Sequence, residues 1–168
     1  SSRARLFWTI KERTALAQAT RVVTVSESAK REIAARLGYP ADRIRVLPEA
    51  PAPQFAPRTL GPEDLARLRA AGAAPEDGYL LHVGGISPHK NLERLVGAFA
   101  RVASDPRHAR LRLVLAGDVA NDPFFSSADA VRAAVARHSL EARVVFTGYV
   151  PDDLLALLYN GAIALVFP

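Results

Sequence analysis

Two glycines and a lysine form the part of this sequence that is best suited to chemistry. Gly84 and Gly85 follow a short apolar run, Tyr79 to Val83, and Lys90 comes five residues later. Glycines at a strand end let backbone N–H groups approach a ligand closely, because no Cβ stands in the way. An amphipathic helix is predicted from residue 92, and the positive end of its dipole adds to the lysine charge. The pattern therefore predicts an anion site of the kind that binds phosphate.

The bare pattern leaves a second interpretation open. It matches neither the dinucleotide-binding fingerprint nor the phosphate-binding motif GxxxxGK[ST], so an ordinary strand-to-helix turn with a surface lysine explains it equally well. His89 could donate to the same anion as Lys90, although loop histidines are commonly only solvated. His82 lies within the predicted strand, where a histidine with satisfied hydrogen bonds is the more common case. No two of the four histidines have the spacing of a metal motif, so we predict no metal site.

The elements that must position these residues alternate regularly after Tyr79. Strands are expected at 79–83, 111–116, 143–147 and 163–167, and helices at 92–103, 128–138 and 151–159. This alternation predicts the α/β class, with a Rossmann-like parallel sheet and flanking helices. The apolar run from Ile163 to Phe167 suits a strand that is covered on both faces. Ligands bind beyond the carboxyl ends of such strands, where Gly117 and Gly148 also stand.

The first part of the chain predicts a different unit. Its expected elements are a helix at 3–19, a strand at 21–25, a helix at 27–37 that ends at Gly38, and a strand at 44–47. Five of the twelve prolines fall between Pro48 and Pro62, which favours an extended, semi-rigid linker. We therefore expect residues 1–50 to be the last part of one domain, residues 51–74 to be a linker with a short helix, and residues 75–168 to belong to a second domain.

Composition narrows the class of protein. The chain has 168 residues, of which 49% are hydrophobic and 23% charged, and no apolar run approaches the roughly 20 residues that a bilayer span requires. The lack of cysteine excludes disulfides and thiolate metal sites, and without a signal-like segment it predicts a cytoplasmic location. The net charge of +5 comes from scattered arginine, which favours a solvated surface over a nucleic-acid patch. The absence of methionine indicates a processed chain or a part of a longer protein.

Three stretches together resemble a known family. They are VVTVSESAKREIAARLGYPADRIRVLPEAP, YLLHVGGISPHKNLERLVGAFARV, and LRLVLAGD with RVVFTGYVPDDLLALLYNGAIALVFP. In their order and spacing they resemble the retaining glycosyltransferases of family 4, whose GT-B fold has two Rossmann-like domains facing a cleft. The resemblance covers the chain from residue 20 onward. It implies an internal fragment: the end of the acceptor domain, a linker, and the first half of the donor-nucleotide-binding domain.

The resemblance also implies an activity. Such enzymes transfer a sugar from a nucleotide-diphosphate donor to a glycan or lipid-linked acceptor, with retention of anomeric configuration and without a metal or other cofactor. Lys90 matches the lysine that contacts the donor phosphates, and it is the expected catalytic residue. The segment from Gly148 to Val150 matches the loop that lines the nucleotide base. The residues expected at the donor are Gly84, Gly85, His89, Lys90, Gly117, Gly148, Tyr149 and Val150.

The chain departs from the family pattern in two ways. Many members carry an arginine directly after the first glycine of the turn, where this chain has Gly85, and His89 is the expected substitute cation. The family's pair of glutamates for donor sugar and ribose would follow Pro168, so we expect the 168 residues alone to be inactive. A non-catalytic nucleotide- or phosphate-binding module is the alternative, and a scaffold whose turn binds nothing is a third hypothesis. A basic surface would suit a peripheral contact with an anionic membrane, and we expect no nucleic-acid partner.

Overall fold

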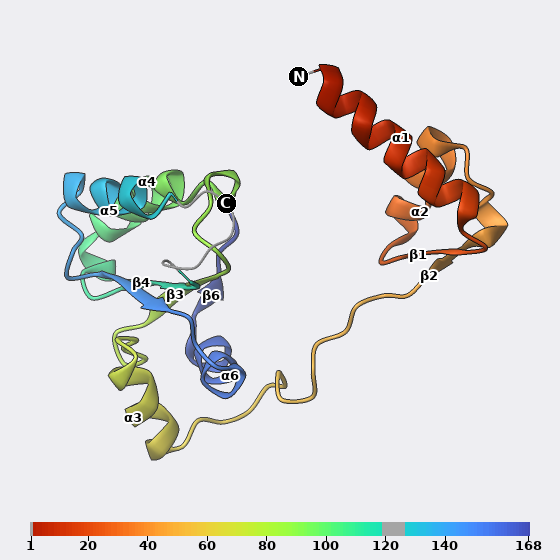
Figure 1. Cartoon of the computed structure of the whole chain (residues 1–168). Helices are drawn as coiled ribbons and strands as arrows, with labels where there is room; N and C mark the ends of the chain where they lie inside the picture. The colour runs from red at the N-terminus through yellow and green to blue at the C-terminus, as the bar shows by residue number, and fades with distance from the viewer. Residues whose placement is uncertain (1, 119–126) are drawn as a thin grey trace. The chain divides into compact units, whose positions relative to one another are not determined.

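The computed structural model describes residues 2–118 and 127–168, and the side chains from residue 4 onward (Figure 1). The chain divides into two compact units, Ser1–Ala52 and Pro53–Pro168. No helix in the described ranges is long and apolar enough to cross a membrane. Each unit has its own parallel strands, so each can be understood by itself.

The first unit contains two helices and a pair of short strands. Its elements are α1 (Ser2–Gln18), β1 (Val22–Thr24), α2 (Glu27–Leu37), a 3₁₀ turn (Ala41–Arg43) and β2 (Ile44–Val46). β1 and β2 are parallel, with Val22 opposite Ile44. Ser26 begins α2, because its Oγ accepts a hydrogen bond from the N–H of Ala29 at 3.1 Å. Gly38 ends this helix in the left-handed region at φ 68°, which confirms the predicted bounds.

The second unit is a four-stranded parallel sheet with helices on both faces. Its elements are α3 (Pro62–Ala70), β3 (Tyr79–Val83), a 3₁₀ turn (Pro88–Lys90), α4 (Leu92–Ala103), a 3₁₀ turn (Pro106–His108), β4 (Arg112–Ala116), α5 (Ala128–Arg137), β5 (Val144–Gly148), α6 (Asp152–Gly161) and β6 (Ala164–Leu165). The strand order is β5-β4-β3-β6, and every pairing is parallel. Figure 1 shows α4 and α5 on one face of this sheet and α3 and α6 on the other. The predicted α/β class and the Rossmann-like parallel sheet are confirmed.

Alternating side chains of the central strands build a core on each face. Leu113 and Leu115 of β4 pack in one cluster with Val96 and Phe99 of α4 and Val131 of α5. Val114, between them, packs in the other cluster with Leu68 of α3, Leu81 of β3 and Leu157 of α6. The two central strands are therefore covered on both faces, as a long apolar run predicts.

The prediction for Ile163 to Phe167 is wrong in one respect. This run was expected to be covered on both faces, but Ile163, Leu165 and Phe167 are 67%, 47% and 64% exposed. β6 is one of the two edge strands and pairs with β3 alone among the described strands, so the described elements cover it less than the central strands. An apolar run alone does not distinguish a central strand from an edge strand, and that is why the pattern misled.

Part of the proline-rich stretch is attached to the second unit. Asn160 of α6 accepts a hydrogen bond from the N–H of Arg58 at 2.7 Å and donates to the carbonyl of Ala56 at 3.2 Å. The helix α3 contributes Leu68 to a core cluster of the sheet. The segment from Pro53 therefore belongs structurally with residues 75–168. The roles of the two units as acceptor and donor domains stay a prediction.

Candidate functional site at the carboxyl edge of the sheet

The carboxyl ends of three strands meet at glycines. The N–H of Gly84 donates to Ala116 at 2.9 Å, and the N–H of Gly117 donates to Gly148 at 3.0 Å. A Cβ on Gly117 would stand 1.9 Å from the carbonyl oxygen of Gly84, so only glycine fits there. Gly84 (φ 142°) and Gly148 (φ 69°) have backbone angles that favour glycine. The three strand ends therefore form one closely packed stretch of backbone.

The segment between β3 and α4 is held in place by the burial and hydrogen bonds of Ile86. Ile86 is buried in the core. Its carbonyl accepts two hydrogen bonds from Ser127, one from the N–H at 2.8 Å and one from the Oγ hydroxyl at 3.1 Å. Lys90 closes the 3₁₀ turn by donating its N–H to Ser87 at 2.9 Å. Asn91 then begins α4 in the left-handed region at φ 54°. These contacts fix the backbone from which the Lys90 side chain extends.

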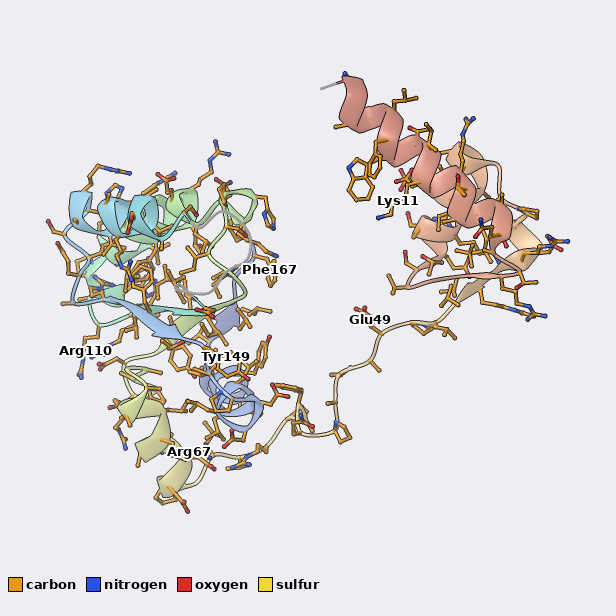
Figure 2. All side chains as sticks on the ribbon, in the orientation of Figure 1. Lys11, Glu49, Arg67, Arg110, Tyr149 and Phe167 are labelled. Carbon is orange, nitrogen blue, oxygen red and sulfur yellow. The ribbon has the colours of Figure 1, made fainter. Side chains whose placement is uncertain are left out.

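The side chain of Lys90 lies beside the glycine turn. Its Cε is 4.0 Å from the point where a Cβ on Gly84 would stand. Its Nζ is 5.6 Å from the centre of the Phe167 ring, and the exposed Phe167 side chain can be followed in Figure 2. Lys90 forms no ion pair with any residue that the structure describes. An ammonium group that has no counter-charge among the described residues, beside a glycine turn, suits an anion.

His82 lies beneath the same turn and is fully buried. Its Nδ1 is 3.0 Å from the carbonyl of Val166. A carbonyl only accepts, so Nδ1 carries the proton and Nε2 of the neutral ring is an acceptor. Nε2 has no hydrogen-bond partner in residues 2–118 and 127–168, and it is 3.7 Å from the Cβ position of Gly84. His82 was predicted to have its hydrogen bonds satisfied in the core, but among the described residues only Nδ1 has a partner.

The pKa of His82 is lowered from its ordinary value. Burial is the main cause, because the protein interior disfavours the charged imidazolium. The hydrogen bond to Val166 acts in the opposite direction and raises the pKa, while the positive charge of Lys90 lowers it further. His82 is therefore neutral near pH 7 and keeps its acceptor.

The other predicted site residues differ in their surroundings. His89 is exposed in the same 3₁₀ turn as Lys90, and Gly85 is partly buried beside Gly84. Tyr149 is 77% exposed and is labelled in Figure 2, whereas Val150 packs against the cluster around α3 and α6. The structure thus brings Gly84, Lys90 and Gly117 close together and leaves the side chains of His89 and Tyr149 in solvent.

Sequence reasoning missed the part of His82 in this edge, whereas it expected Phe167 at the carboxyl end of the last strand. The acceptor nitrogen of His82 and the ring of Phe167 both lie near Lys90, and the centres of the His82 and Phe167 rings are 5.4 Å apart. A signal for His82 was present, because a histidine two residues before a strand-end glycine must be close to that turn. Phe167 ends the last predicted strand, which predicts its place at this edge, and the pairing of β6 with β3 brings it near Lys90.

Metal-binding side chains do not cluster in the described ranges. Within residues 2–118 and 127–168, no three histidine, aspartate or glutamate side chains are grouped so that they could hold a metal ion. The expectation that the donor reacts without a metal stays a prediction.

Comparison with known protein families agrees with this fold. Residues 77–168 match the family described as Glycosyl transferases group 1, and residues 1–50 match Glycosyltransferase Family 4. The chain belongs to the group 1 glycosyltransferases. This membership confirms the resemblance that the three sequence stretches indicated.

Individual glycosyltransferases are similar over most of this chain. O-antigen chain mannosyltransferase B of Escherichia coli is 30% identical over 147 residues, which are 88% of this chain and 36% of that protein. 2-Deoxystreptamine glucosyltransferase of Streptomyces kanamyceticus is 30% identical over 162 residues, 95% of this chain and 39% of that protein. The structure of Anabaena HepE in complex with UDP and glucose aligns with a TM-score of 0.68 at 19% identity, over 89% of this chain and 38% of that one. The chain thus spans little more than a third of these glycosyltransferases.

Proposed function

We propose that the protein containing this chain transfers a sugar from a nucleotide-diphosphate donor to a glycan or lipid-linked acceptor, with retention of configuration. The observation that carries this proposal is the placement of Lys90 beside Gly84 at the carboxyl edge of the sheet. The names of the relatives support the reaction class, because they include a mannosyltransferase and a glucosyltransferase. The UDP and glucose in the HepE structure support a nucleotide-sugar donor.

Each part of the edge has a proposed role. The backbone of Gly84 and Gly85 lets the donor diphosphate approach, and Lys90 neutralises the charge that develops on the β-phosphate as the sugar leaves. His89 supplies a second positive charge when it is protonated. Gly117 keeps the neighbouring strand end free of side-chain atoms, and Gly148, Tyr149 and Val150 line the nucleotide base. The reaction needs no bound metal, and it takes place in the cytoplasm, where the protein can dock on an anionic membrane surface.

The test is a transfer assay on the full-length protein. Titration with UDP, GDP and ADP first identifies the base, and the matching sugar nucleotides then serve as donors. A charge-assisted contact contributes about 1.5–3 kcal/mol, so Lys90→Ala is expected to lower turnover by about ten- to a hundredfold. Arg101→Ala is the control, because Arg101 is an exposed cation in the last turn of α4, at the far end of the helix from Lys90. Equal turnover in wild type and Lys90→Ala would refute the proposal.

A further inference from the structure

The buried imidazole of His82 needs an explanation that the proposed roles do not supply. Its Nδ1 is bonded to Val166, which leaves Nε2 as an acceptor without a partner in the described residues. A buried acceptor that makes no hydrogen bond lowers the stability of a fold. Gly84 has no side chain to fill the space beside Nε2, which is 3.7 Å from the position that a Cβ on Gly84 would take.

The side chain of Lys90 reaches the same space. Its Cε is 4.0 Å from the Cβ position of Gly84 that Nε2 also faces. Phe167 lies against both groups, 5.4 Å from the His82 ring and 5.6 Å from the Lys90 ammonium. The charge of Lys90 is also close enough to act on His82. A neutral Nε2 accepts one hydrogen bond and an ammonium donates three, so the two groups are complementary.

We infer that His82 is a positioning residue for Lys90. Rotation about the terminal bonds of the flexible lysine side chain brings its ammonium to Nε2 of His82, which accepts one N–H. The two remaining N–H groups of the ammonium then point toward the glycine turn. The bond from Nδ1 to Val166 holds the ring in the tautomer that this contact requires. The inference rests on the proposed function, because the anion at the turn is the donor diphosphate. It adds a specific task for His82 in holding that diphosphate.

A double-mutant cycle on the full-length protein tests the coupling. The probe is whichever of UDP, GDP and ADP binds the wild type most tightly, measured by calorimetry. His82→Phe keeps the ring volume without the acceptor, and Lys90→Met keeps the chain length without the ammonium. Loss of one hydrogen bond predicts about three- to tenfold weaker binding for His82→Phe. The same substitution in the Lys90→Met background is expected to have no further effect. Independent, multiplying effects would overturn the inference.

Rescue separates positioning from packing. His82→Gln retains an acceptor oxygen and is expected to recover most of the affinity that His82→Phe loses. If His82 had a purely structural role, the loss of affinity in each variant would instead parallel the decrease in its melting temperature. Equal affinity of the Gln and Phe variants would therefore count against the inference.

A second measurement needs no ligand and no change at His82. In nitrogen-15 spectra of the ligand-free protein, we expect the Nδ1–H tautomer and an Nε2 signal that moves toward that of an unbonded acceptor in Lys90→Met. An Nε2 signal that is identical in both proteins would overturn the inference and leave the phosphate role of Lys90 intact. Conversely, if no nucleoside diphosphate bound the wild type, the proposed function would fail, and the diphosphate-positioning role would fail with it, whatever the spectra showed.

Discussion

The two edges of the parallel sheet use their charges in opposite ways. At the amino-terminal edge, Asp77 forms ion pairs with Arg110 and Arg112. Arg143, which precedes β5, donates to the carbonyls of Leu111 and Ala103 at 3.0 Å each and of His108 at 2.6 Å. Arg143 therefore uses its hydrogen bonds within the fold, and the charge of Asp77 is compensated by two arginines of the same edge.

At the carboxyl edge, the N–H groups of Gly84 and Gly117 bond within the sheet, but the side chain of Lys90 is not used in this way. Glycines replace side chains at three strand ends, and Lys90 has no ion-pair partner among the described residues. His82 leaves one nitrogen unbonded beneath the turn. Groups kept for a ligand contribute little to stability, whereas groups bonded within the fold contribute directly. The amino-terminal edge thus stabilises the sheet, and the difference supports the proposal that the carboxyl edge binds the ligand.

The largest effect on stability is expected from the closest contact at the carboxyl edge. Gly117→Ala places a Cβ 1.9 Å from the carbonyl oxygen of Gly84, so β3 and β4 must separate locally. We expect the free energy of unfolding to fall by about 3 kcal/mol, at the upper end of overpacking effects, in urea denaturation. Gly97→Ala is the control, because a Cβ at Gly97 of α4 would lie 3.8 Å from Nε2 of His138, its nearest contact among the described residues. That substitution is expected to stabilise by about 0.5–1 kcal/mol. Equal stability of the two variants would contradict the packing described for the strand ends.

Exchanging a cation at each edge sharpens the contrast. Arg143→Met removes three hydrogen bonds to backbone carbonyls and is expected to cost about 2–3 kcal/mol of folding free energy, measured by thermal unfolding. Lys90→Met is expected to change stability by less than about 0.5 kcal/mol, as for surface substitutions. The effect on nucleoside-diphosphate affinity should be the reverse: Lys90→Met should weaken binding more than Arg143→Met does. A Lys90→Met protein that unfolds as readily as Arg143→Met would break the comparison.

A smaller effect is expected in the pH dependence of stability. The pKa of His82 is lowered in the folded protein, so below 6.5, its ordinary value, the unfolded chain binds the proton more readily. The neutral ring therefore contributes stability above that pH, and the contribution is lost as the pH falls toward the folded pKa. His82→Phe is expected to flatten this slope in urea denaturation between pH 7 and 5. An unaltered slope in His82→Phe would show that other groups govern it.

The fold was largely predictable because its signals are local. The apolar runs at Tyr79–Val83 and in β4, with α4 between them, predicted a covered parallel sheet that the structure confirms. The exposure of β6 was not predictable, since it depends on strand order rather than on the sequence of the strand. The glycines and Lys90 were visible as a pattern. The contact between Gly117 and Gly84 and the unbonded nitrogen of His82 arise only when separate strands are brought together.

The central claim is that the carboxyl edge holds a donor diphosphate through Lys90. The most direct measurement is calorimetric titration of UDP, GDP and ADP into the full-length protein and its Lys90→Ala variant, with the corresponding monophosphates in parallel. We predict that one diphosphate binds the wild type and that Lys90→Ala weakens its binding by about tenfold or more, while binding of the monophosphate changes less. Equal diphosphate affinity in the two proteins would contradict the account.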